Sequence, residues 1–179
     1  MKNFLRKLYN DRQQQQGFTL VELVLYIGIS SVVLFATSLF LSTLLAARIK
    51  NQTIAEVEQQ GLYVMTSITQ ALRNADTIGA PTQGASAASL TIHTYPGASD
   101  PTIFDLSGGT IRITEGSNAP IALSNSRVIA SVLTFQNFSR TNTPGTIRIA
   151  FTLSHLNPSG RNEYSFTKNF YGSASLRQP

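Results

Sequence analysis

The sequence of 179 residues lacks cysteine entirely, and it has no proline before Pro81. Without thiols the chain has no disulfide framework and offers no cysteine-based metal site or nucleophile. Between Phe18 and about Ala75 only Gly28 and Gly61 interrupt the proline-free stretch. Because proline and glycine are the residues that break helices, their scarcity permits one long, uninterrupted helix over this range.

Charge is also scarce and unevenly placed. The formal net charge is +5, of which residues 1–17 contribute +3 through four basic residues and one acid. Nucleic-acid recognition needs basic residues gathered on one face, whereas after residue 50 they are scattered singly. We therefore expect no direct nucleic-acid binding. The basic residues of the first segment are Lys2, Arg6, Lys7 and Arg12.

A charge-free apolar run extends from Leu23 to Ala47, and its 25 residues exceed the roughly 20 that a bilayer core requires. Its serines and threonines do not exclude a membrane span, since helical hydroxyls bond back to the preceding turn. A cleavable secretory signal has a shorter core of about 7–15 residues. Signal cleavage after Ala46 and Ala47 is an alternative that the sequence leaves open.

From Arg48 onward the pattern becomes that of an amphipathic helix, with apolar or small residues at alternating steps of three and four. This side either packs on the chain's own globular domain, which we favour, or binds a partner helix. The residues of this seam are Ile54, Val57, Gly61, Met65, Ile68, Leu72 and Ala75.

The remaining part, residues 76–179, holds nine of the twelve glycines and all seven prolines, and it alternates short β-branched and aromatic runs with turn signals. Such a pattern predicts an antiparallel sheet with one buried face, which the amphipathic helix would cover. "SGGT" (107–110) predicts a hairpin turn. The predicted fold class is therefore α+β. The expected strands are Ser89–Tyr95, 102–106, Thr110–Thr114, 120–124, Val128–Phe138, Thr146–His155 and Glu163–Tyr171.

The acid Glu22 lies at the start of the apolar stretch and needs an explanation. A carboxylate costs up to about 2.5–3.5 kcal/mol at the centre of a membrane helix and less near its edge, so it is retained only with a partner. No Lys or Arg lies between residues 13 and 47. Cleavage between Gly17 and Phe18 would create an α-ammonium one helical turn from Glu22. The first turn of a helix also favours negative charge.

The segment "GFTLVELVLYIGI", Gly17 to Ile29, closely resembles the type IV prepilin signature. In that family a membrane-embedded aspartyl peptidase cuts after the glycine and N-methylates the new terminal residue. The glutamate five residues into the mature chain is needed for assembly and pairs with the terminal amine of a neighbouring subunit. The resemblance implies that Gly17 precedes the cut, Phe18 becomes the methylated terminus, and Glu22 is the assembly glutamate.

The resemblance implies a protein without enzymatic activity that assembles into a type IV pilus, a type II secretion pseudopilus or a DNA-uptake filament. Its partners would be prepilin peptidase, other pilin or pseudopilin subunits and an inner-membrane assembly platform. The basic leader predicts a single-pass, inner-membrane protein with a cytoplasmic N-terminus and an extracytoplasmic head. The implied regions are a removed leader (1–17), a transmembrane and assembly half-helix (18–47), an amphipathic half-helix (48–75) and a β-rich head (76–179).

Some features depart from the pattern of major pilins. The apolar run contains no helix-disrupting proline, no cysteine pair closes a loop near the C-terminus, and the leader is long and Gln-rich. These features favour a minor pilin or a J-class-like minor pseudopilin. The alternative is an uncleaved, signal-anchored protein whose extracytoplasmic β-rich domain binds a ligand.

The other candidate residues indicate no cofactor and no catalytic or metal site. His93 and His155, the only histidines, lack the neighbouring ligands that a zinc site needs. Asp100 and Asp105 flank a loop that could supply oxygen ligands for calcium, but two acids are too few to predict a site. No serine lies in a nucleophile elbow or a recognisable triad.

Overall fold

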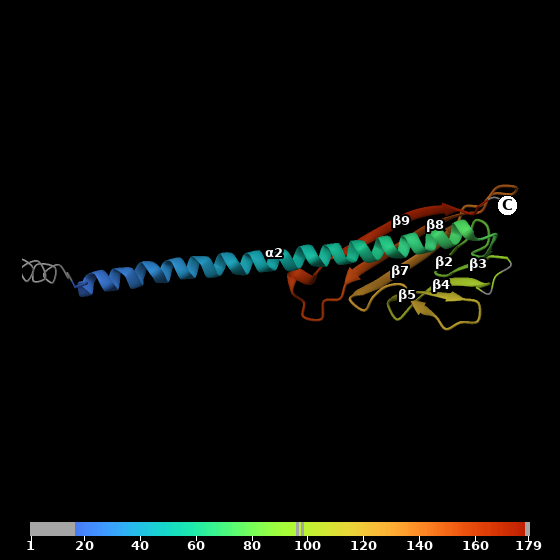
Figure 1. Ribbon diagram of the computed structural model, residues 1–179. Helices are drawn as coiled ribbons and strands as arrows, with labels where there is room; N and C mark the ends of the chain where they lie inside the picture. The colour runs from blue at the N-terminus through green and yellow to red at the C-terminus, as the bar shows by residue number, and fades with distance from the viewer. Residues whose placement is uncertain (1–16, 96, 98, 178–179) are drawn as a thin grey trace, which may run out of the picture. The chain divides into compact units, whose positions relative to one another are not determined.

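The computed structural model describes residues 17–95, 97 and 99–177. Its first element is a single long helix, α2 (Leu20–Asn74), of 55 residues (Figure 1). The predicted long N-terminal helix is therefore confirmed. The chain divides into two units, Met1–Leu45 and Ala46–Pro179. Apart from Gly17, the predicted leader lies outside the described residues.

In the first unit the apolar side chains of α2 are exposed. Its most apolar 18-residue window has a mean hydropathy of 2.2, and by length and composition this helix could cross a membrane. Its hydroxyls bond to the helix's own carbonyls: Ser31 Oγ donates to the Ile27 oxygen at 2.7 Å, and Thr37 Oγ1 donates to the Val33 oxygen at 3.0 Å. These polar groups are thus satisfied without water, as a lipid environment requires.

In the second unit α2 buries one stripe of residues against the sheets. Five positions of the predicted seam are buried, namely Val57, Gly61, Ile68, Leu72 and Ala75. Two are only half-buried, Ile54 and Met65, and their neighbours Thr53 and Val64 take the buried places. The predicted and observed buried positions differ by one residue because, with 3.6 residues per turn, two adjacent residues can lie on either side of the same narrow stripe.

The head contains two antiparallel sheets where the sequence predicts one. The first sheet has the order β1-β3-β4-β5-β6 and the second β2-β7-β8-β9. The strands of the first are β1 (Thr77–Ala80), β3 (Leu90–His93), β4 (Thr102–Ser107), β5 (Thr110–Glu115) and β6 (Ile121–Ala122). Those of the second are β2 (Ser86–Ala87), β7 (Val128–Asn137), β8 (Thr146–His155) and β9 (Thr167–Ser175). A short 3-10 helix, η2 (Asn162–Tyr164), precedes β9.

The expected strands are present, with ends shifted by a few residues, and β8 has the predicted ends. The two strands that the sequence did not predict, β1 and β2, have four and two residues. Gly79 interrupts β1, and β2 has no β-branched or aromatic residue, so neither segment carries the sequence signal of a strand. The predicted hairpin turn is confirmed, since Ser107 pairs with Thr110 and the intervening Gly108 and Gly109 have φ of 57° and 77°. Positive φ at both positions is what a two-residue hairpin turn requires.

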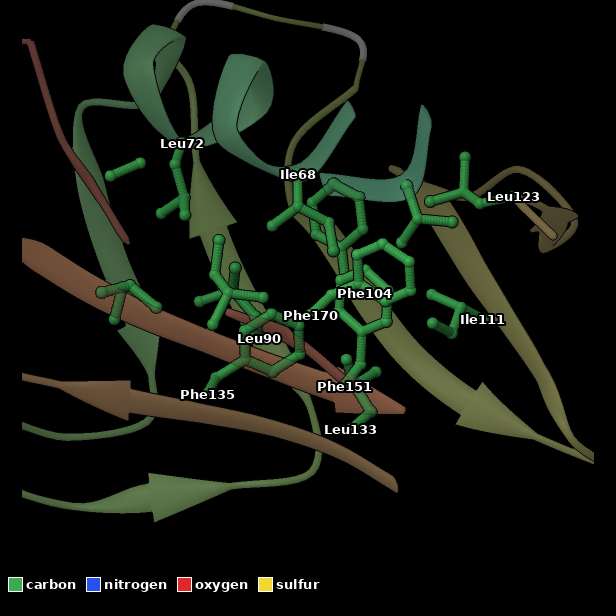
Figure 2. Close-up of a cluster of buried hydrophobic side chains, with 14 of the residues drawn as sticks. Ile68, Leu72, Leu90, Phe104, Ile111, Leu123, Leu133, Phe135, Phe151 and Phe170 are labelled. Atoms are coloured by element: carbon green, nitrogen blue, oxygen red, sulfur yellow. The ribbon is translucent and has the colours of Figure 1, made fainter. Parts of the chain in front are cut away.

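The core of the head lies between α2 and both sheets. Figure 2 shows Ile68 and Leu72 of α2 together with four phenylalanines, one each from β4, β7, β8 and β9. The rings of Phe151 and Phe170 stack with centroids 5.1 Å apart. In β8 the alternating inward residues are buried, as predicted, and each sheet contributes one apolar face to a shared core. The phenylalanines are Phe104, Phe135, Phe151 and Phe170.

Gly61 allows α2 to approach β9 closely. A Cβ atom at Gly61 would lie 2.0 Å from Cζ of Phe170, and one at Gly172 would lie 2.5 Å from the sulfur of Met65. The helix and the strand can therefore pack closely because each has a glycine at the contact, Gly61 in α2 and Gly172 in β9. In Figure 1 this part of α2 runs beside β9.

Candidate functional site

The start of α2 is set by Thr19. Its hydroxyl accepts the Glu22 backbone N–H at 3.2 Å, and its carbonyl accepts the Leu23 N–H at 3.1 Å. This is the N-cap arrangement, which satisfies an otherwise unpaired donor of the first turn. Gly17 and Phe18 precede the helix and are exposed. The peptide bond between them therefore lies in exposed, non-helical chain.

Glu22 has a hydrogen-bond partner that the sequence did not predict. The Tyr26 hydroxyl donates to Glu22 Oε1 at 3.0 Å. The four-residue spacing between them places both side chains on one face of the helix. That spacing is the signal in the sequence, but a tyrosine carries no charge that marks it as a partner for a carboxylate. None of the ion pairs formed by residues 17–95, 97 and 99–177 includes Glu22.

Phe18 lies on the same face as this pair. Its ring meets the Tyr26 ring edge to face, with centroids 6.3 Å apart and planes at 77°. Phe18, Glu22 and Tyr26 thus form a cluster that we call the terminal triad. It combines one anionic carboxylate, one neutral donor and an aromatic side chain beside the Gly17–Phe18 bond. Such a cluster can hold a carboxylate in place.

Residues 12–38, which include the terminal triad, match the family described as the prokaryotic N-terminal methylation motif. The chain carries the methylation motif of type IV prepilins. The match supports the type IV prepilin and pseudopilin family, whose members are processed by prepilin peptidase and are structural rather than enzymatic. Together with the long apolar helix, the methylation motif supports anchoring in a membrane. No curated protein and no solved structure matches the chain.

The two loop acids, Asp100 and Asp105, have different side-chain partners, and one of these partners is His93. His93 Nδ1 lies 2.8 Å from Asp100 Oδ1. Arg112 donates to both carboxylate oxygens of Asp105, at 2.9 and 2.7 Å, and these hydrogen bonds raise the pKa of the guanidinium. The acids considered for calcium therefore contact different side chains, Asp100 that of His93 and Asp105 that of Arg112. Within the described ranges no group of three or more His, Asp or Glu residues could hold a metal ion.

His155, the last residue of β8, belongs to a second cluster, which also contains Glu56 of α2 and Tyr164 of η2. Its ring is largely buried and stacks on Tyr164 with centroids 5.8 Å apart. Its Nε2 lies 3.6 Å from Glu56 Oε2, while its buried Nδ1 has no hydrogen-bond partner in the described part of the chain. The cluster borders a pocket of about 480 Å³. The sequence did not predict this pocket, because its residues come from distant segments.

Proposed function

We propose that this chain is a minor pilin or pseudopilin subunit that assembles through its N-terminal helix into a type IV pilus, a type II secretion pseudopilus or a DNA-uptake filament. The observation that carries the proposal is the terminal triad. It places a single carboxylate, held by a neutral donor, at the start of an otherwise charge-free apolar stretch of helix. A carboxylate in that position needs a cation that the unprocessed segment lacks.

Processing would supply that cation. In this proposal prepilin peptidase removes residues 1–17 by cutting between Gly17 and Phe18, and then methylates the Phe18 amine. Methylation keeps the positive charge of the amine, so the new terminus can still pair with a carboxylate. The mature chain then comprises a transmembrane and assembly half-helix (18–47), an amphipathic half-helix (48–75) and a head (76–179).

The terminal triad would set the axial register between subunits. The Phe18 ammonium of one copy pairs with Glu22 of its neighbour, while the apolar helices pack side by side. The Tyr26 hydroxyl occupies Oε1, so the pairing uses the other oxygen of the same carboxylate. A wrong axial offset leaves a carboxylate and an ammonium unpaired in apolar surroundings, at a cost of several kcal/mol per ion. Correct register is therefore strongly favoured.

The place of the protein in the cell follows from this assembly. Before assembly it spans the inner membrane once, with a cytoplasmic N-terminus and an extracytoplasmic head, and the assembly platform extracts it into the filament. The absence of a proline in the apolar run and of cysteine supports the minor-subunit role.

Substitution of Glu22 tests the proposal. Glu22→Ala is expected to leave membrane insertion intact and to abolish incorporation into filaments, measured by immunoblotting of the sheared filament fraction against the membrane fraction. Glu22→Gln keeps the size and the hydrogen bond to Tyr26 but removes the charge, so it should also fail. Ser31→Ala is the matched control, because the Ser31 hydroxyl bonds only to its own helix. Normal incorporation of the Glu22 variants would contradict the register mechanism.

A further inference from the structure

A depression lies in the head between α2 and the chain that follows β6. Its volume is about 350 Å³, which is in the range of small-molecule sites. None of the described residues that line it is charged, and five of the seven have a polar side chain. All of them belong to the head unit. They are Gln59, Gln60, Tyr63, Ala122, Leu123, Ser124 and Asn125.

The wall opposite α2 is held in place from two sides. The Asn125 N–H donates to Gln60 Oε1 of α2 at 3.2 Å. The Leu123 N–H donates to the Ile111 oxygen of β5 at 2.8 Å, and the Ile111 N–H donates to Ser124 Oγ at 3.3 Å. The segment after β6 is therefore tied both to the helix and to the neighbouring strand, so the depression is preformed. A preformed site loses little conformational entropy when a ligand binds.

The helical wall presents an aromatic ring that the core does not use. Tyr63 is 56% exposed, although it lies midway along the part of α2 that belongs to the head. Gln59 precedes it by four residues and is also exposed, so the two side chains lie on one face of the helix. The Gln60 oxygen already accepts the Asn125 N–H, which leaves the Gln60 nitrogen as a donor. The wall thus combines a flat apolar ring with two amide groups.

The acids on the adjacent turn of α2 already have partners. Glu56 Oε1 accepts a hydrogen bond from Asn125 Nδ2 at 3.1 Å, and Glu56 Oε2 lies 3.6 Å from Arg127. Glu58 pairs with Lys168. A charged ligand in the depression would therefore lose hydration without gaining an ion pair, which is costly. The lining favours a neutral ligand that has both hydrogen-bonding groups and an apolar face.

A sugar ring has both properties. Its C–H groups form an apolar face that packs on an aromatic ring, and its hydroxyl groups donate and accept hydrogen bonds, as side-chain amides do. We propose that the depression binds a neutral oligosaccharide, with one sugar ring stacked on Tyr63 and its hydroxyl groups bonded to Gln59 and Gln60. The site adds a binding activity to the proposed assembly role. Its biological setting rests on the extracytoplasmic head of that role, which would meet polysaccharides of the cell envelope and of other surfaces.

Saccharide binding by the full-length protein tests this site. The protein is kept in lauryldimethylamine oxide, because a detergent with a sugar headgroup would compete. Saturation-transfer-difference NMR, titrated to obtain Kd, is measured with cellotriose, maltotriose and chitotriose, and with trigalacturonic acid as the charged comparison. We expect at least one of the neutral trisaccharides to bind, and trigalacturonic acid to bind about tenfold more weakly or not at all, since the depression offers its carboxylates no cation.

Substitutions on the helical wall test the individual contacts. Tyr63→Ala should raise Kd about tenfold or more because it removes the stacking ring, whereas Tyr63→Phe should keep most of the affinity. Gln59→Ala should raise Kd several-fold through lost hydrogen bonds. Tyr171→Ala is the matched control, because Tyr171 is 66% exposed on β9 and is not among the lining residues, so its loss should leave Kd unchanged. All three side chains are exposed, so the far-ultraviolet circular dichroism should not change.

Failure of all three neutral trisaccharides to bind at millimolar concentration would overturn the proposal, and so would an equal loss of affinity in Tyr171→Ala. Equally tight binding of trigalacturonic acid would overturn the assignment to a neutral ligand. Loss of filament incorporation in Tyr63→Ala without any saccharide binding by the parent would assign this face to a contact between subunits, which also contradicts the proposal. Glu22→Ala should lose incorporation and keep saccharide binding, so the site and the assembly mechanism can fail separately.

Discussion

Replacement of Gly61 by alanine tests the packing of the helix on the head. An ideal Cβ at this position lies 2.0 Å from Cζ and 2.2 Å from Cε1 of Phe170. The Phe170 ring has little room to retreat, because it is buried and stacked on Phe151. Alanine gains about 1 kcal/mol of helix propensity over glycine. Overpacking of a filled core costs about 1–3 kcal/mol, so we expect net destabilisation of up to about 2 kcal/mol.

The assay is thermal unfolding of the full chain in detergent, followed by circular dichroism. One kcal/mol corresponds to roughly 3–5 °C in a domain of this size, so Gly61→Ala should lower Tm by up to about 10 °C. Gly172→Ala is the comparison, since its Cβ meets the flexible Met65 thioether and should cost less. Adding Phe170→Leu to Gly61→Ala should recover part of the loss. A rise in Tm for Gly61→Ala alone would refute the close helix–strand contact.

Three further predictions concern the core, the terminal triad and the loop before β9. Phe151→Ala should lower the free energy of unfolding by about 3–5 kcal/mol in the same assay, because it empties a buried ring site; an effect under 1 kcal/mol would contradict the core assignment. Tyr26→Phe should reduce filament incorporation less than Glu22→Ala, since it removes only the hydrogen bond to Oε1; normal incorporation would leave that bond without a role. The lowered pKa of Glu163 gives the loop stability that is present above the ordinary value of 4.5 and is lost as pH falls through the folded-state pKa. Glu163→Gln should therefore destabilise the protein at neutral pH and match the parent in acid, and an equal Tm difference at both pH values would contradict the lowered pKa of Glu163.

The long helix could be predicted because its signals are local. The proline-free stretch and the three-and-four spacing each depend on neighbouring residues, and so does the alternation that predicted β8. The division of the strands into two sheets could not be predicted in this way. It depends on pairings such as β1 with β3 and β2 with β7, which join segments that the local pattern does not relate. In particular, β2 pairs through only two residues.

The residues of the candidate sites also differ in whether a local sequence pattern can reveal them. Gly17, Phe18 and Glu22 could be predicted as site residues because the motif that contains them is contiguous. Tyr26 is equally close in sequence. Inside an apolar run, however, the sequence does not distinguish a tyrosine that only packs from one whose hydroxyl donates a hydrogen bond to a carboxylate, as Tyr26 does to Glu22. The contact between Glu56 and His155 joins the helix to β8, so no local pattern signals it.

The most direct test of the account is the mass of the N-terminal peptide of the mature protein, purified from cells in which prepilin peptidase is active. We predict a chain that begins at Phe18 and carries one methyl group on its amine, with no residue of 1–17 remaining. A chain that still begins at Met1 would show the uncleaved anchor, and one that begins after Ala47 would show an ordinary signal peptide. Either result would contradict the assembly mechanism.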